Sequence, residues 1–234
     1  TSSGKTEIYI SLIIEYLKSG KTVLFLVPEI ALTTQLVLRF NQFFSNELIV
    51  YHSSISQNIR HEIWNELNST NSPKIILGVR SSIFLPHKNI SLIIVDEEHE
   101  NSYKQFDPKP RYNARDCAIF LSKYLKINCL LGSATPSLET YNNSINNKFS
   151  LVELKERYGN FLPPEIILIE PPKSENTFFS NELIRYIKTT LESEKQIILF
   201  RNRRGYSTYL KCSACNHINI CPNCDVSLTY HLND

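Results

Sequence analysis

The sequence has no long apolar run, no visible leader and no strong excess of charge. Nowhere do about 18 consecutive apolar residues occur, so no segment is expected to span a membrane as a helix. The N-terminus shows no basic stretch followed by an apolar one, so no secretory signal peptide is visible. The formal net charge is only +2, so any contact with nucleic acid must come from local basic patches.

Methionine is also missing, even from the first position, which Thr1 occupies. The sequence stops shortly after a cluster of cysteines. We therefore expect the chain to be an interior piece of a longer protein. Its 234 residues allow one large domain or two modest ones, and a hydrophobic share of 42% is ample for a buried core.

The six cysteines fall into two groups. Cys117 and Cys129 stand alone among apolar residues, which predicts that both are buried in the core. The others form the pattern C-x2-C-x5-C-x2-C at Cys212, Cys215, Cys221 and Cys224. Without a secretion signal, metal binding is favoured over disulfides, and each C-x2-C pair can offer two thiolates to tetrahedral Zn²⁺. A redox function for one pair is the alternative.

Short runs rich in Val, Ile and Leu alternate with helical patterns over the first part of the chain. The runs lack strict alternation of apolar and polar residues, which favours strands covered on both faces, as in a parallel sheet. The expected strands are Val23–Val27, Leu48–Tyr51, Ile75–Val79, Leu92–Val95 and Cys129–Leu131. The expected helices are Glu7–Lys18, Ala31–Phe44 and Ser56–Asn68. This order predicts an open α/β sheet with right-handed crossovers.

The second part of the chain has a different pattern. The polar segment Asn142–Lys148 is predicted to be a linker, and a second unit is expected to begin near Leu151. That unit has a predicted helix at Asn181–Glu192 and a predicted buried strand at Gln196–Phe200, an order typical of the start of another α/β lobe. The expected parts are a first lobe at 1–147, the start of a second lobe at 148–210 and a partial zinc-binding region at 211–234.

The first six residues match the end of a phosphate-binding loop, G-x-x-x-x-G-K-[ST]. In such loops the glycine lets backbone N–H groups surround the phosphates, and the positive end of the following helix points at them. Lys5 would reach the β- and γ-phosphates of ATP, and the Thr6 hydroxyl would be a ligand of Mg²⁺. The expected ATP-binding residues are Ser2, Ser3, Gly4, Lys5 and Thr6. Taken alone, the motif also fits a flexible surface loop.

Two adjacent carboxylates, Asp96 and Glu97, follow the predicted strand that ends at Val95. Asp96 is expected to hold Mg²⁺, and Glu97 to orient and deprotonate the water that attacks the γ-phosphate. A solvated acidic turn is the alternative, but the phosphate-binding motif upstream argues against it. The catalytic candidates are therefore Lys5, Asp96 and Glu97. The D-E-x-H pattern, which His99 completes, favours a helicase over a kinase or a GTPase.

Small polar residues follow the strand predicted at Cys129–Leu131. Ser133 and Thr135 can hydrogen-bond to the carboxylate motif and relay its state, although an ordinary capped turn has the same composition. The motifs Pro28-Glu29 and Gly78-Val79-Arg80 follow two other predicted strands. Because ligands of open α/β sheets bind at the carboxyl ends of the strands, this placement predicts a ligand site there.

Taken in order, the motifs resemble those of one helicase family over nearly the whole chain. They are T-S-S-G-K-T-E-I-Y, V-P-E-I-A-L-T, Y-H-S-S, G-V-R-S-S-I-F, D-E-E-H-E-N-S-Y-K-Q, P-R-Y-N-A-R-D, G-S-A-T-P-S-L-E-T, F-R-N-R-R-G-Y and C-P-N-C-D-V-S-L-T-Y-H. This set resembles the PriA family of primosomal replication-restart helicases, within superfamily 2. The resemblance implies RecA-like lobes and a 3′-to-5′ DNA helicase, driven by ATP and Mg²⁺, that acts at abandoned replication forks.

The same resemblance implies partners and zinc sites. Expected partners are forked DNA, single-stranded-DNA-binding protein and the primosome proteins that load the replicative helicase, in the cytoplasm near the nucleoid. The family binds two zinc ions through eight cysteines in interleaved pairs. On that pattern Cys212 and Cys215 would serve one ion, Cys221 and Cys224 the other, and neither site would be complete in this chain.

The resemblance also gives the segment Asn101–Arg115 a coupling function. In the family, an aromatic-rich loop at this place links DNA binding to ATP hydrolysis. Its aromatic residues would be Tyr103, Phe106 and Tyr112, and its cations Lys104, Arg111 and Arg115. Base stacking and phosphate contact are the physical rationale, and a loop packed on its own lobe is the alternative. Further coupling residues would be Arg80, His99, Gln105, Ser133 and Thr135.

The sequence departs from the family pattern at Ser2, where glycine is usual, and the family's arginine finger would lie beyond Asp234. Two other functions fit the sequence less well. A non-catalytic zinc-ribbon module on an inactive α/β scaffold is disfavoured by the intact Lys5, Asp96 and Glu97. An RNA helicase or a restriction-type translocase is disfavoured by the cysteine cluster.

Overall fold

The computed structural model describes residues 4–31, 34–86, 88–155, 164–170 and 179–200, together with 212, 214, 215, 217 and 218. The chain divides into two compact units, Thr1–Leu162 and Pro163–Asp234, and each is described by itself. None of the described helices has the length and apolar character that a membrane crossing requires.

The first unit is built on a five-stranded parallel sheet with the order β2-β3-β1-β4-β5. The strands are β1 (Thr22–Leu26), β2 (Leu48–Tyr51), β3 (Ile75–Gly78), β4 (Ile90–Asp96) and β5 (Asn128–Gly132). All five lie within a residue or two of the predicted runs, so the predicted parallel α/β sheet is confirmed.

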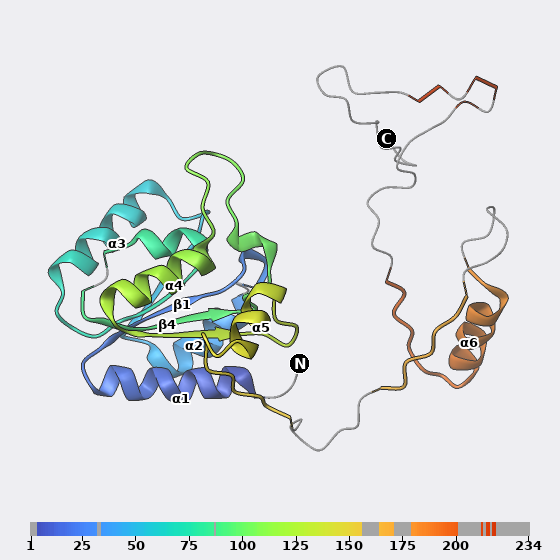
Figure 1. Cartoon of the computed structure of the whole chain (residues 1–234), viewed down its shortest axis with the longest axis horizontal. Coiled ribbons are helices and arrows are strands. Elements are labelled where there is room, and N and C mark those ends of the chain that lie inside the picture. The colour runs from blue at the N-terminus through green and yellow to red at the C-terminus, as the bar shows by residue number, and fades with distance from the viewer. Residues whose placement is uncertain are drawn as a thin grey trace. The chain divides into compact units, whose positions relative to one another are not determined.

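Helices cover both faces of this sheet (Figure 1). The α-helices of the first unit are α1 (Lys5–Lys18), α2 (Thr34–Phe44), α3 (Gln57–Ser69), α4 (Ala114–Leu125) and α5 (Leu138–Ile145). Short 3-10 helices are η1 (Glu29–Ala31), η2 (Arg80–Phe84) and η3 (Asn101–Tyr103). In Figure 1, α1 and α2 lie below the sheet, and α3 and α4 lie above it.

Alternate residues of each strand pack into different halves of the core. In β1, Val23 and Phe25 join the cluster that contains the buried residues of α1 and α2. Leu24 and Leu26 join the cluster that contains those of α3 and α4. All four side chains are at most 1% exposed, and each fully buried side chain of this size contributes about 1.5–3 kcal/mol. Burial on both faces explains why the strand sequences are continuously apolar.

Local side-chain caps fix where several helices begin. Ser56 accepts a hydrogen bond from the backbone N–H of Ile59 at the start of α3, and Ser137 accepts one from Thr140 at the start of α5. Such caps satisfy backbone donors that have no partner inside the helix, and each is worth about 1 kcal/mol. The start of α1 is different, because Gly4 occupies its N-cap position with a left-handed φ of 82°.

Two predictions for the first unit need correction. The helix expected at Ala31–Phe44 is shorter: Glu29–Ala31 forms η1, and α2 begins at Thr34. The linker expected at Asn142–Lys148 is wrong for its first four residues, because α5 continues to Ile145. The asparagine-rich composition concealed a helix that starts at the Ser137 cap.

The second unit contains α6 (Asn181–Glu192), which has the predicted bounds and begins at a Ser180 cap. The strand predicted at Gln196–Phe200 is wrong, because these residues form no ladder. Ile198 is 94% exposed and Phe200 88% exposed. An apolar segment is stable as an inner strand only when neighbouring strands pair with it and layers cover it. The residues of this unit that the structure describes include no such neighbour.

Candidate nucleotide-binding and catalytic site

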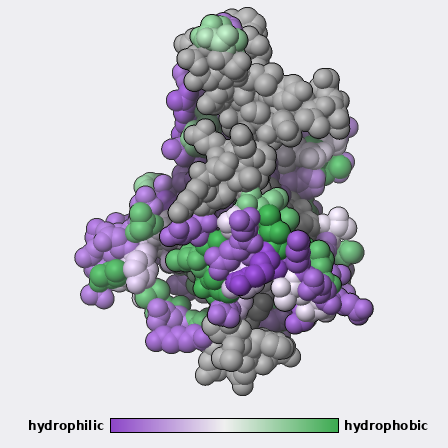
Figure 2. Space-filling view, turned by 90° about the vertical axis from the view of Figure 1, so that its right-hand side faces the viewer, coloured by the Kyte–Doolittle hydropathy of each residue, from purple (hydrophilic) through white to green (hydrophobic). Residues whose placement is uncertain are grey.

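The candidate site lies at the carboxyl edge of the sheet, on the right in Figure 1. There α1 begins after Gly4, β4 ends at Asp96 and β5 ends at Gly132. Figure 2 shows the molecule from the right-hand side of Figure 1, and the described residues in view are a mixture of hydrophilic and hydrophobic ones. A cavity of about 480 Å³ opens here, and Lys5, Tyr9, Gly132 and Ser133 are among its lining residues.

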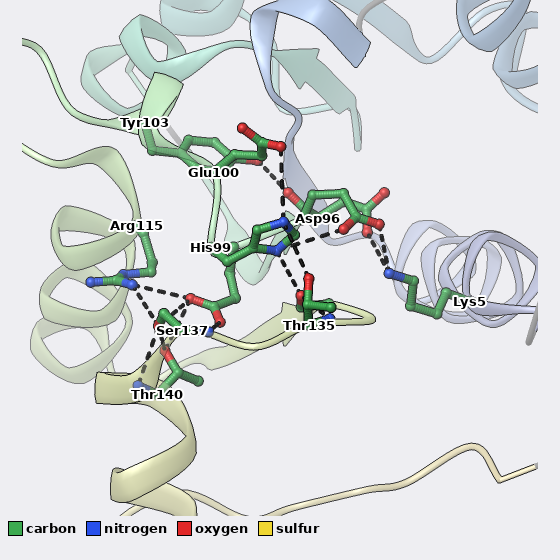
Figure 3. Close-up of polar contacts among 12 residues, drawn as sticks. Lys5, Asp96, His99, Glu100, Tyr103, Arg115, Thr135, Ser137 and Thr140 are labelled. Carbon is green, nitrogen blue, oxygen red and sulfur yellow. Dashed lines mark hydrogen bonds and ion pairs between the residues drawn. The ribbon is translucent and has the colours of Figure 1, made fainter. Parts of the chain in front are cut away.

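Lys5 contacts both candidate carboxylates (Figure 3). Its Nζ lies 2.7 Å from Oε1 of Glu97 and 3.8 Å from Oδ1 of Asp96. Lys5 and Glu97 are 92 positions apart in sequence, so the fold of the sheet, and not local structure, brings them together. Glu97 has a left-handed φ of 47°, which turns the chain sharply as it leaves β4. A strained turn of this kind is common where a side chain is aimed at a ligand.

The Asp96 carboxylate contacts two side chains of α1, those of Lys5 and Tyr9. The hydroxyl of Tyr9, one turn after Lys5 on α1, donates a hydrogen bond to Oδ1 of Asp96 at 3.1 Å. Burial raises the pKa of Asp96 above its ordinary value, although the Lys5 cation opposes that shift. Burial and the nearby carboxylates likewise raise the pKa of Tyr9, which therefore keeps its proton and remains a donor. Sequence reasoning missed Tyr9. Its position four residues after Lys5 on a helix was the available signal.

Tyr103 is buried beneath the site and does not face solvent. It is only 1% exposed, and its hydroxyl lies 2.6 Å from the carbonyl oxygen of Asp96 and 3.0 Å from that of Leu26. The phenol therefore ties η3 to the ends of β1 and β4. Base stacking was expected of Tyr103, and that expectation is corrected because a buried ring has no free face.

His99 joins the carboxylate turn to the segment after β5. Its Nδ1 lies 2.7 Å from Oγ of Ser133, and its Nε2 lies 3.4 Å from Oγ1 of Thr135. The carboxylates of Glu97 and Glu100 lie 3.7 and 3.8 Å from the ring nitrogens. The residues predicted to relay the state of the carboxylate motif are thus in contact with it, although the relay itself stays a prediction.

Glu98 anchors α5 to the same turn. Its carboxylate, which is 1% exposed, accepts hydrogen bonds from the backbone N–H of Ser137, from the hydroxyls of Ser137 and Thr140, and from Arg115 (Figure 3). Burial alone would raise the pKa of Glu98, but these donors outweigh it and hold the pKa below its ordinary value. Arg115 is consequently paired inside the unit, which corrects its predicted place among the cations that contact DNA.

A family model described as DEAD/DEAH box helicase matches residues 1–144, which is more than half of the chain. The chain belongs to the DEAD/DEAH box helicase family. It is 44% identical to the replication restart protein PriA of Rickettsia felis, 40% to that of Bacillus subtilis and 46% to that of Haemophilus influenzae, over 99% of its own length in each case. The predicted resemblance to PriA is confirmed. The chain spans about a third of these relatives, from 29% to 36% of their length.

In this helicase domain, the segment between η3 and α4 projects from the layer above the sheet as a long loop (Figure 1). An isolated bridge pairs Lys104 with Asn113 at its base, and Nε2 of Gln105 donates to the carbonyls of Pro108 and Pro110. Nη1 of Arg80 donates to the carbonyls of Ser102 and Lys104. Gln105 and Arg80 therefore organise the loop.

The loop carries exposed aromatic and basic side chains. Phe106 is 59% exposed, and the ammonium of Lys104 lies 4.9 Å from the centre of its ring. Arg111 is exposed as well. Tyr112 packs edge-on against Phe84, with 4.7 Å between ring centres, which places it in the base of the loop.

The remaining predicted site residues are only partly described. Thr6 is half-buried in the first turn of α1, whereas Ser2, Ser3, Cys221 and Cys224 lie outside the described residues. Cys212 and Cys215 are exposed, and the described part of the chain contains no cluster of three metal-binding side chains. Cys117 and Cys129, predicted to be core residues, pack against the core but are only partly buried.

Proposed function

We propose that this chain is the nucleotide-hydrolysing segment of an ATP-dependent DNA helicase that restarts replication at stalled or abandoned forks. The observation that carries the proposal is the convergence of Lys5, Asp96 and Glu97 at one edge of a parallel sheet. It occurs in a chain that is 40–46% identical to proteins named for replication restart. An inactive scaffold has no reason to keep these three groups in contact.

The arrangement suits a triphosphate. Gly4 and the backbone N–H groups that open α1 would surround the phosphates, and Lys5 would contact the β- and γ-phosphates. Mg²⁺ fits the donors present, because the Asp96 carboxylate and the Thr6 hydroxyl are the oxygen ligands that it prefers. When bound, Mg²⁺ neutralises phosphate charge. Glu97 would then accept a proton from the attacking water.

Coupling to DNA would begin at the loop. Phe106 offers an exposed ring for base stacking, and Lys104 and Arg111 offer cations for phosphates. Tyr103 connects the base of that loop to the carbonyl of Asp96. His99, Ser133 and Thr135 would carry the state of the nucleotide to the segment after β5.

Finer features of the proposal rest on the similarity to PriA. They are 3′-to-5′ polarity, forked DNA as substrate, and partnership with single-stranded-DNA-binding protein and with helicase-loading primosome proteins. Residues 148–210 would begin a second RecA-like lobe, and a later part of the full-length protein would supply the arginine finger. The long relatives, of which this chain spans about a third, leave ample length for these parts.

The test is hydrolysis and unwinding by the full-length protein. We expect ATP-dependent separation of forked DNA, no separation of an equivalent RNA fork, and stimulation of ATP hydrolysis by DNA.

Phe106→Ala should weaken DNA stimulation about tenfold, since one stacked base contributes about 1–3 kcal/mol, and should leave basal hydrolysis unchanged. Phe120→Ala is the matched control, because Phe120 is also exposed, at 71%, but lies on α4. A wild-type protein without ATP-dependent unwinding of DNA would overturn the proposed function. Full stimulation of Phe106→Ala would overturn only the stacking assignment.

We also propose that the cysteine cluster binds zinc as two interleaved sites that need cysteines from elsewhere in the full-length protein. Hydrogen bonds from the backbone N–H groups of Cys215 and Ala214 lower the pKa of Cys212, as suits a thiolate ligand. Metal analysis is expected to find two zinc ions in the full-length protein and little in the 234-residue chain. One tightly held ion in the shorter chain, with all four clustered thiols protected from alkylation, would show a single self-contained site instead.

A further inference from the structure

Tyr9 lies where the phosphate-binding helix meets the ends of β4 and β5. It follows Lys5 by one turn of α1 and is 3% exposed. Its ring packs edge-on against Phe25 of β1, with 5.5 Å between ring centres, and Phe25 stacks in turn on Phe40 of α2 at 5.2 Å. These contacts fix the direction of the phenol, because a ring packed in a core has little rotational freedom.

The only group that the fixed phenol is seen to donate to, among the described residues, is the Asp96 carboxylate. The distance from its hydroxyl to Oδ1 is 3.1 Å. Holding one oxygen of a carboxylate fixes its rotation, and therefore the direction in which the other oxygen presents its lone pairs.

Gly132 supplies the room that this hydrogen bond needs. A Cβ placed on Gly132 would lie 1.7 Å from the Tyr9 hydroxyl oxygen and 2.9 Å from the carbon that bears it. Gly132 also pairs with Asp96 in the register between β5 and β4. The small residue at the end of β5 and the phenol of α1 are therefore complementary. A larger side chain at position 132 would push the Tyr9 hydroxyl away from Asp96.

We propose that Tyr9 is a positioning residue that orients Asp96 for Mg²⁺, and that Gly132 is glycine in order to admit the phenol. The proposal rests on the proposed function, in which Asp96 holds Mg²⁺. Mg²⁺ demands near-ideal octahedral geometry, so a carboxylate that rotates freely is a poorer ligand. Groups that orient a metal ligand typically change metal affinity by about 10–100-fold. The sensitive quantity is therefore the Mg²⁺ dependence of nucleotide binding.

The experiment measures ADP binding to the full-length protein by calorimetry, with saturating Mg²⁺ and with EDTA. Tyr9→Phe removes only the hydroxyl. The increase in ADP affinity that Mg²⁺ produces is expected to be about tenfold smaller in this variant than in wild type, with ADP binding in EDTA unchanged. The Mg²⁺ concentration that gives half-maximal ATP hydrolysis should rise to a similar extent. Tyr16→Phe is the matched control, because it also removes a hydroxyl from α1. That hydroxyl accepts a hydrogen bond from Nδ2 of Asn128 at 2.6 Å.

Gly132→Ala tests the same contact from the other side and should weaken the Mg²⁺ dependence in the same direction, with the folded state checked by circular dichroism. If Tyr9→Phe keeps the wild-type Mg²⁺ dependence, the positioning assignment is overturned while the proposed function stands. A wild-type protein that binds no Mg²⁺–ADP overturns the proposed function and, with it, this inference. An equal loss in Tyr16→Phe would show a general effect of α1 and would also overturn the assignment.

Discussion

Lys5→Ala in the full-length protein is expected to lower the rate of DNA-stimulated ATP hydrolysis by about a hundredfold or more. A preorganised donor aimed at charge that develops in the transition state is commonly worth a factor of this size. The same change frees Glu97 from the ammonium that lies 2.7 Å away, so an intact base would remain without its phosphate clamp. Steady-state phosphate release with saturating forked DNA measures the effect.

Lys18→Ala is the control for Lys5→Ala, since Lys18 is an exposed lysine at the other end of α1. It should hydrolyse ATP at the wild-type rate. Circular dichroism should show the same helical content in all three proteins. Turnover by Lys5→Ala within a few-fold of wild type would contradict the assignment of Lys5 to the phosphates.

Glu98→Ala is expected to destabilise the first unit by about 3 kcal/mol, because it removes the buried acceptor of the Ser137 backbone N–H and of the Ser137 and Thr140 hydroxyls. It also removes one of the two carboxylates that pair with Arg115, the other being that of Asp116. The Glu98 carboxylate is 1% exposed and the Arg115 side chain 13%, so solvent screens this pair weakly. Denaturant unfolding of the 234-residue chain measures the loss through Trp64, its single tryptophan, which lies on α3.

Glu66→Ala is the matched control for Glu98→Ala, since Glu66 pairs with Lys74 at 2.7 Å but is 45% exposed. Exposed pairs contribute at most about 1 kcal/mol. Equal losses in the two variants would contradict the anchoring assignment of Glu98.

The anchor also predicts a dependence on pH. The pKa of Glu98 is lowered in the folded state, so its contribution is complete above the ordinary value of 4.5 and is lost as the pH falls from there toward the folded value. Wild type should therefore lose more stability than Glu98→Ala over that acid range. Parallel curves for the two proteins would contradict this sign.

The sheet and its ligand edge could be predicted because both depend on short-range patterns. Apolar runs such as Ile90–Asp96 can be stable only between two covering layers, and parallel strands carry the residues after them to one edge of the sheet. That rule predicts that Asp96 and Glu97 lie at the ligand edge, and the phosphate-binding motif at Lys5 adds the prediction that α1 begins there.

The contacts of Tyr9, Glu98 and Tyr103 could not be predicted, because they depend on distances between segments far apart in sequence. Tyr9 reaches Asp96 across 87 positions, and Glu98 reaches Thr140 across 42. Tyr103 was assigned to DNA because aromatic residues beside cations have the same composition whether they point outward or inward. At Gln196–Phe200 the apolar pattern predicted a buried strand, but Ile198 and Phe200 are exposed and the described residues of this unit include no strand that pairs with the segment.

In the proposed function, the γ-phosphate and the Glu97 carboxylate would compete for the ammonium group of Lys5, which lies 2.7 Å from Glu97. One ammonium group cannot hold both partners at ion-pair distance, since Lys5 would have to leave the carboxylate in order to reach the phosphates. A bound triphosphate would draw Lys5 toward itself and would thereby release the Glu97 carboxylate. The binding of a triphosphate and the release of the Glu97 carboxylate from its ion pair would therefore be a single exchange of partners by Lys5.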